Sequence, residues 1–96
     1  MKLNAANISL TLYIIGMTPL SKRALINIES ICAATPLANK CTLNIVDLND
    51  NPGLAEQKKI LATPLLIKNT PKPEIRILGD LSNIEKIISL LELERP

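Results

Sequence analysis

The chain has 96 residues, of which 47% are hydrophobic, and its 11 Lys and Arg residues against 9 Asp and Glu residues give a formal net charge of +2. A chain of this length buries roughly 60–70% of the surface that it exposes when unfolded, so we expect one domain over residues 1–96 with a core of Ile, Leu and Ala. The charges form no block of like sign and Tyr13 is the single aromatic residue, which argues against nucleic acid as a partner.

The first half of the chain predicts a strand, a helix and a second strand. Apolar residues alternate over Ile8–Ile15, and the second face is partly apolar too, which is typical of a central strand covered on both sides. Thr18 is placed to cap a helix that begins at Pro19 and ends near Ala34. Alternation over Cys41–Val46 then predicts a strand parallel to the first. The inward face of the helix is expected to consist of Leu20, Ala24, Leu25, Ile28, Ile31 and Cys32.

A short helix and a Thr-Pro step open the second half of the chain. The helix is expected to turn Leu54, Lys58 and Leu61 to one face and to continue to Ala62. Because the residue before a proline is pushed out of helical dihedrals, Thr63-Pro64 marks the boundary between this helix and a strand. Trans is favoured at an X-Pro bond by only about 0.5–1 kcal/mol, so Pro64 is also a candidate cis-proline.

Two strands and a last helix complete the chain. The strands are predicted over Leu65–Ile67 and Glu74–Leu78, with a proline-containing loop between them. Ser82 and Glu85 match a capping box, in which each side chain satisfies a backbone donor of the other at the start of a helix. The predicted order is therefore βαβαββα. The inward face of the last helix is expected to be Ile84, Ile87, Ile88 and Leu91.

The α/β chain resembles the thioredoxin-like superfamily. It shares the order of elements, a strand-turn-helix near the amino terminus and a Thr-Pro step at the start of a later strand. In that superfamily the active-site turn lies at the first helix and the cis-proline loop faces it. The turn here is Thr18-Pro19-Leu20-Ser21, which has no sulfur at either end, so thiol-disulfide exchange at this turn is excluded. Thr18 and Ser21 have no histidine to act as a base, so we expect no catalytic residue here.

The remaining composition points to a protein without a metal or a cofactor. Cys32 and Cys41 could supply at most half of a zinc site, and the chain has no histidine. We expect both cysteines to be reduced and structural in a cytoplasmic protein, and a bridge between them is the alternative. Residues 1–7 do not read as an export signal, and no apolar run approaches the roughly 20 residues of a membrane span, so we expect no membrane partner.

Several segments together, in the right order over nearly the whole chain, resemble the KaiB family of clock-related proteins. Each segment is a weak signal alone, and their order along the chain gives the resemblance its weight. The segments are residues 12–19, 21–25, 45–47, 51–52, 60–64 and 79–83.

The resemblance implies a regulatory protein that binds a KaiC-like hexameric ATPase, in a clock-related or in a stress or metabolic signalling system. KaiB proteins adopt two folds that share the amino-terminal βαβ unit. The carboxy-terminal half is either thioredoxin-like (αββα) in a monomer that binds the ATPase, or βααβ in a tetrameric ground state. We therefore expect self-association as a homotetramer or dimer. Gly79 and Asp80 match the family's fold-switch position, and Arg23, Lys59 and Arg76 are candidate partner contacts.

Two other functions stay open at the level of sequence. One is a thioredoxin-like redox or thiol-binding protein that uses Cys32 or Cys41, although neither lies at the start of the predicted helix. The other is a stand-alone sensor module that stays monomeric, like the KaiB-like domain of clock histidine kinases. An insulin-reduction assay and a native mass measurement separate these from a KaiB-type regulator.

Overall fold

In residues 8–34 and 40–92, which the computed structural model describes, four strands form one sheet in the order β2-β1-β3-β4. The chain order βαβαββα predicted from the sequence is confirmed, with one 3-10 turn added after the second strand. The elements are β1 (Ile8–Ile14), α1 (Pro19–Ala33), β2 (Cys41–Asp47), η1 (Leu48–Asp50), α2 (Leu54–Lys58), β3 (Leu65–Thr70), β4 (Ile75–Leu78) and α3 (Ile84–Glu92).

The strand β1 lies inside the sheet, as its apolar residues on both faces predict. It pairs in parallel with β2, from Ile8 opposite Cys41 to Ile14 opposite Asp47, which confirms the amino-terminal βαβ unit. On its other side β1 pairs antiparallel with β3, and β3 pairs antiparallel with β4. The second half of the described chain thus has the thioredoxin-like αββα arrangement and not the βααβ one.

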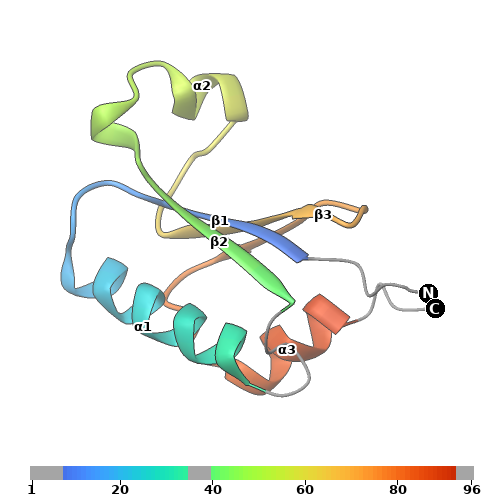
Figure 1. Cartoon of the computed structure of the whole chain (residues 1–96). Coiled ribbons are helices and arrows are strands. Elements are labelled where there is room, and N and C mark those ends of the chain that lie inside the picture. The colour runs from blue at the N-terminus through green and yellow to red at the C-terminus, as the bar shows by residue number, and fades with distance from the viewer. Residues whose placement is uncertain (1–7, 35–39, 93–96) are drawn as a thin grey trace.

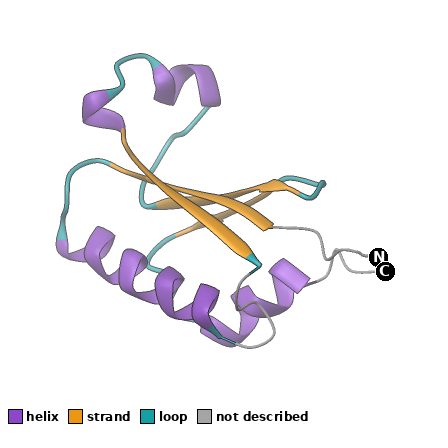
Figure 2. Cartoon of the chain, in the orientation of Figure 1, coloured by secondary structure: helices purple, strands orange, loops and turns teal. Residues whose placement is uncertain are grey.

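The helices α1 and α3 cover one face of the sheet, and α2 lies over the other (Figure 1). Figure 2 shows the same layers coloured by secondary structure. Alternation along β1 explains the two layers, because its odd and even residues face opposite helices. The core on the α1 and α3 side contains Ile8, Leu10, Leu12, Ile14, Ala24, Ile28, Ile31, Leu66, Leu81, Ile87 and Leu91. The core on the α2 side contains Tyr13, Leu48, Ile60, Leu65 and Ile67.

The predicted inward face of α2 is correct for Leu54, which packs against the core on this side, and wrong for Lys58 and Leu61. The helix ends at Lys58, and Lys59 takes the left-handed conformation with φ of 59°. This turn directs the chain away from the helix axis, so Ile60 is buried and Leu61 is 99% exposed. The lysine at position 58 is exposed as well.

Two details of the helix starts also differ from the prediction. In α1, Ser21 is buried and Leu20 is exposed, because Ser21 continues the three- and four-residue spacing of Ala24 and Ile28 towards the sheet. In α3, the capping residue is Asn83, whose Oδ1 accepts from the backbone N–H of Lys86 at 3.3 Å.

The predicted capping box of Ser82 and Glu85 is therefore not formed. Ser82 lies before the cap, where its backbone N–H donates to Oδ1 of Asp80 at 3.1 Å. Its carbonyl accepts from the backbone N–H of Ile84 at 3.0 Å. An Asp side chain two residues upstream forms such a turn readily, and it moves the helix start by one residue.

No helix in residues 8–34 and 40–92 is long and apolar enough to cross a membrane.

Candidate functional site

The turn that carries the active site in thioredoxins is a helix cap in this chain. The side-chain oxygen of Thr18 accepts from the backbone N–H of Ser21 at 3.1 Å, and its hydroxyl donates to the Ser21 hydroxyl oxygen at 3.1 Å. Pro19 occupies the first turn of α1, where its missing N–H costs nothing. These contacts hold the start of the helix in place and present no activated nucleophile.

Three connections meet at this end of the sheet (Figure 1). They are the turn from β1 to α1, the linker from α2 to β3 and the connection from β4 to α3. Leu65 in β3 pairs with Tyr13 on one side and with Leu78 on the other, and the Gly79 N–H donates to the Pro64 carbonyl at 2.9 Å. The Thr63-Pro64 peptide bond is cis, at the position where the sequence suggested one. Segments far apart in the sequence therefore meet at this end of the sheet.

This end of the sheet carries exposed hydrophobic side chains. Leu61 is 99% exposed and Leu78 is 60% exposed, so both side chains lie largely in solvent. Five exposed apolar side chains belong to the connections and element ends at this end of the sheet, and exposed apolar area of this kind is a candidate for a protein-binding surface. We call this set the apolar end surface, and its members are Ile15, Met17, Leu20, Leu61 and Leu78.

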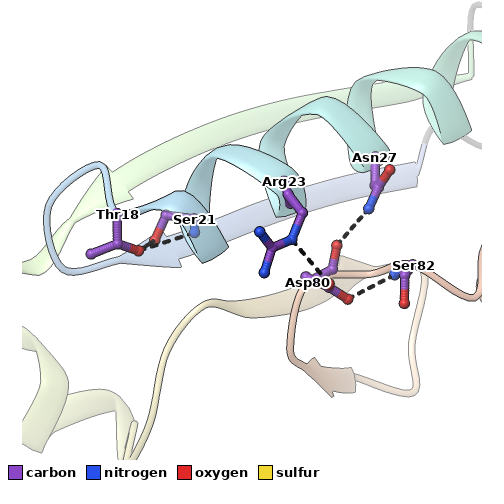
Figure 3. A network of polar contacts seen from close by, with 6 residues as sticks. All are labelled: Thr18, Ser21, Arg23, Asn27, Asp80 and Ser82. Atoms are coloured by element: carbon purple, nitrogen blue, oxygen red, sulfur yellow. Dashed lines mark hydrogen bonds and ion pairs between the residues drawn. The ribbon is translucent and has the colours of Figure 1, made fainter.

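A polar network lies beside this surface and joins α1 to the connection before α3 (Figure 3). Arg23 Nε lies 3.4 Å from Oδ2 of Asp80, and the Asn27 side-chain amide donates to the Asp80 carbonyl at 2.8 Å. The Arg23 side chain remains 57% exposed, so its ion pair is worth little by itself. The network nevertheless holds Asp80 against the middle of α1.

The backbone around Asp80 has an unusual conformation. Gly79 has φ of 112°, and Leu81, a buried residue with a side chain, has φ of 63°. Hydrogen bonds from the Ser82 hydroxyl and backbone N–H, with a smaller effect of the Arg23 guanidinium, hold the pKa of the Asp80 carboxyl below its usual value. The ionised Asp80 thus accepts donors from both sides of a strained turn.

Arg76 is bound within the chain and does not stand free. Its guanidinium donates to the carbonyls of Lys58 and Lys59 at 2.8 and 3.1 Å and to the Glu74 carboxylate at 2.8 Å. Those carbonyls are the exposed acceptors at the end of α2, where a cation is favourable. Arg76 is thus brought beside Lys59, whereas Arg23 contacts Asp80 on the α1 side of the molecule.

Cys32 and Cys41 lie away from the turn at Thr18. Cys32 belongs to the last turn of α1 and Cys41 begins β2, and both are free thiols. Within the part of the chain that the structure describes, no group of three or more Cys, Asp, Glu or His side chains is placed to hold a metal ion.

A sequence model of the KaiB domain matches residues 11–93. The chain belongs to the KaiB family. It is 42% identical over 86 residues to the "Circadian clock protein KaiB3" of Synechocystis sp., with 90% of this chain and 83% of that protein covered. It is 46% identical over 84 residues to the "Circadian clock oscillator protein KaiB" of Thermostichus vulcanus, with 88% of this chain and 77% of that protein covered.

Solved structures give the fold of this KaiB family chain. The amino-terminal domain of Synechococcus elongatus SasA superposes with a TM-score of 0.75 at 23% identity, over 96% of this chain and 86% of that one. Chloroplastic thioredoxin z superposes with a TM-score of 0.68 at 16% identity, over 90% and 79%. The thioredoxin-like fold expected from the sequence is thereby confirmed.

Sequence reasoning missed the main features of this end of the KaiB fold. It placed Leu61 inside, because it extended the helical spacing past Lys59. It treated Arg23 and Asp80 as separate positions, since a sequence separation of 57 leaves no local signal of a pairing. The Asp at position 80, two residues before Ser82, was the only available hint of the turn that the structure shows.

Proposed function

We propose that the chain is a non-catalytic regulatory protein that binds a KaiC-like hexameric ATPase in a clock-related or a stress or metabolic signalling system. Membership of the KaiB family supports this proposal, as do relatives named as circadian clock proteins. The observation that carries it is chemical. The position of the thioredoxin dithiol is a Thr18–Ser21 cap, and exposed hydrophobic side chains lie at the same end of the sheet.

The apolar end surface is the docking surface in this proposal. Apolar area removed from water contributes about 25 cal/mol per Å², so Leu61 and Leu78 gain most from a partner because they are the most exposed. Leu78 belongs to β4, which pairs with β3, and Leu61 lies in the linker from α2 to β3, whose Pro64 carbonyl accepts from the Gly79 N–H, so little of the backbone has to be ordered on binding. The surface therefore fits a preformed binding face.

Charged contacts are assigned to the rim of this surface. The exposed Lys59 lies two residues before Leu61 and is the candidate cation nearest to it in the chain. Arg23 keeps more than half of its side chain in solvent beside Asp80. The Arg76 guanidinium is already bound to the carbonyls of Lys58 and Lys59. Its role in a partner contact is therefore indirect, because it fixes the backbone that carries Lys59.

The test is co-elution of the chain with a KaiC-like hexameric ATPase in the presence of ATP. Leu61→Ser and Leu78→Ser, alone and combined, are expected to weaken co-elution, because each removes an exposed apolar contact. Ile26→Ser is the matched control, since Ile26 is 63% exposed in α1 but lies outside the apolar end surface. Undiminished co-elution of the double variant, or an equal loss with Ile26→Ser, would place the docking surface elsewhere. If the parent chain does not co-elute at all, the proposed partner is wrong.

We also propose that the second half of the chain repacks between two folds, with Gly79 and Asp80 as the hinge, and that the alternative fold self-associates as a tetramer or dimer. The positive φ of Gly79 is costly for any residue with a Cβ, and nothing lies within 4 Å of the position that a Cβ would occupy. Gly79→Ala should therefore act through backbone strain alone. It is expected to change the ratio of monomer to oligomer.

Gly53→Ala is the matched control, because Gly53 also has positive φ and open space around its Cβ position, but lies outside the hinge. Sedimentation velocity on both variants and the parent measures the effect. A Gly79→Ala profile equal to the parent, or equal shifts in both variants, would remove the hinge from the proposal.

Absence of catalysis is tested with insulin reduction. The chain is expected to show no turnover, because the turn at Thr18 has no thiol and Cys32 and Cys41 are far along α1 and in β2. Turnover that disappears in a Cys32→Ser, Cys41→Ser double variant would favour the thioredoxin-like alternative.

A further inference from the structure

The strand β4 forms one edge of the described sheet and directs a row of backbone groups outward. In an antiparallel pair, alternate residues turn both their N–H and their C=O to the same neighbour. The Gly79 N–H donates to the Pro64 carbonyl at the start of β3, so Ile77, two residues earlier, faces β3 as well. Arg76 and Leu78 therefore turn their backbone groups away from β3. No described strand lies beyond β4 to pair with them.

A hollow of about 410 Å³ lies beside this edge, between β4 and α3. Its apolar lining includes Ile77 from β4 and Ile87 and Leu90 from α3. Ile77 and Ile87 belong to the core on the α1 and α3 side, so the hollow lies on that face of the sheet. Because strand side chains alternate between faces, every second side chain of a strand added to β4 would point to this face.

The charges that line the hollow leave one cation without an ion pair. Arg76 and Asp80 each have an opposite charge, Glu74 at 2.8 Å and Arg23 at 3.4 Å. Lys86 is exposed and forms none of the ion pairs found within residues 8–34 and 40–92, and the residues three and four positions from it along α3 are uncharged. A cation in the first turn of a helix is also unfavourable there. A carboxylate on an occupant would complement Lys86.

We propose that the β4 edge and this hollow bind an extended, acidic segment of a partner protein, which adds a strand to the sheet. The backbone groups of Arg76 and Leu78 pair with the segment, as in other proteins that bind peptides by strand addition. One aliphatic side chain enters the hollow, and a carboxylate two residues away, on the same face, lies near Lys86. The strand β4 spans four residues, so the paired segment is about 14 Å long. The site does not depend on the proposed ATPase partner.

A second copy of the chain does not meet these requirements. Antiparallel pairing of two β4 strands about a two-fold axis continues the sheet with the same face on the same side. On the α3 face, β4 presents Ile75 and Ile77, because Ile77 packs against that core and strand side chains alternate. The copy would thus offer Lys86 no carboxylate from its strand, and it would bring a second Lys86 to the same face. An acidic segment of another protein is the better occupant.

The probe is the synthetic heptapeptide Thr-Asp-Thr-Val-Thr-Asp-Thr, whose Val and two Asp side chains share one face in either orientation. It is added at millimolar concentration to the full chain, and backbone amides are followed by NMR. The amides of Arg76 and Leu78 should shift and exchange more slowly, while the amide of Ile77, which faces β3, changes less. No change at Arg76 and Leu78 would overturn the proposal. Protection of these two amides that rises with chain concentration in the absence of peptide would also overturn it, because the edge would then bind a second copy.

Altered peptides test the backbone and the charge separately. Two analogues carry methylated amides at alternate residues, one at Thr and one at Asp and Val. Only one of these sets can face β4, so binding should be lost in one analogue and kept in the other. A peptide with Asn in place of both Asp residues should bind more weakly. Equal binding of the two methylated analogues, or undiminished binding of the Asn peptide, would contradict the proposal.

Variants of the chain test the assigned cation. Lys86→Gln should weaken binding of the Asp peptide about two- to fivefold, as expected for an exposed ion pair, and should leave binding of the Asn peptide unchanged. Lys22→Gln is the matched control, because Lys22 is an exposed lysine of α1 and does not line the hollow. An equal loss in both variants would show a general effect of net charge and would remove Lys86 from the site.

Discussion

Replacing Arg76 by Ala should release α2 from β4. The helix spans five residues, lies wholly in the described part of the chain and buries no side chain completely, so its own packing holds it weakly. The Arg76 guanidinium supplies two hydrogen bonds, at 2.8 and 3.1 Å, to the carbonyls of Lys58 and Lys59. We therefore expect the variant to lose order at α2 before it loses the fold.

The size of the effect follows from these contacts. A hydrogen bond that involves a charged group contributes about 1.5–3 kcal/mol when it is shielded from water. The Arg76 side chain is 36% exposed, and water weakens its hydrogen bonds. We therefore assign the two carbonyl contacts together a free energy near the lower end of that range. The exposed pair with Glu74 adds roughly 0–1 kcal/mol. We expect a loss of about 1.5–2.5 kcal/mol in all, and each kcal/mol lowers the Tm of a chain this small by about 4–8 °C.

Hydrogen exchange followed residue by residue is the sharpest assay. The amides of Lys59 and Ile60 donate to carbonyls within α2, at 3.2 and 2.8 Å, and should exchange faster in Arg76→Ala while the amides of β1 change little. Exchange in Arg76→Lys should be faster than in the parent chain and slower than in Arg76→Ala. A lysine ammonium keeps the positive charge but cannot donate to both carbonyls with the planar geometry of a guanidinium. Glu74→Gln is the control that keeps both carbonyl contacts. Unchanged exchange at Ile60, or equal acceleration in β1, would refute the reasoning.

Three further predictions concern the stability of the fold. Leu12→Ala, at a fully buried position of β1, should cost about 2–5 kcal/mol in urea unfolding, while Leu61→Ala at the exposed surface should change stability by less than about 0.5 kcal/mol. Asn83→Ala should cost about 0.5–2 kcal/mol through the lost cap of α3, and a cost equal to that of an exposed α3 position would contradict the assignment of this cap. The native pKa of Asp80 lies below its unfolded value, so the unfolded chain binds the extra proton and Asp80 stabilises the fold above about pH 4. This contribution is lost as the pH falls through the native pKa of Asp80. The urea midpoints of Asp80→Asn and of the parent chain should therefore converge at acid pH. A difference between the two midpoints that stays constant with pH would contradict this prediction.

The first half of the fold could be predicted because its signals are local. Alternation in β1 and β2, and the proline after Thr18, fix two strands and a helix without reference to distant residues. The second half depends on contacts that cross the sequence. Lys59 takes a left-handed conformation where the end of α2 meets Arg76 of β4, and no spacing rule for α2 contains that information.

The candidate site was predictable in its local features, which are the missing sulfur, the cap by Thr18 and the cis bond before Pro64. Absence of sulfur from Thr18-Pro19-Leu20-Ser21 can be read directly from the sequence. The apolar end surface cannot, because its members come from separate segments that meet only through the pairing of β3 with both β1 and β4. The same holds for Asp80, which reaches α1 only after the sheet has formed.

The lone aromatic ring offers a way to watch the molecule without a label. Tyr13 is 5% exposed and packs with Leu48, Ile60, Leu65 and Ile67 beneath α2. With no tryptophan in the chain, intrinsic emission and near-ultraviolet dichroism arise from that single phenol. A rearrangement that separates β3 or α2 from this ring would change its fluorescence and dichroism. Stopped-flow spectroscopy of the unlabelled protein could therefore measure the rate of that rearrangement.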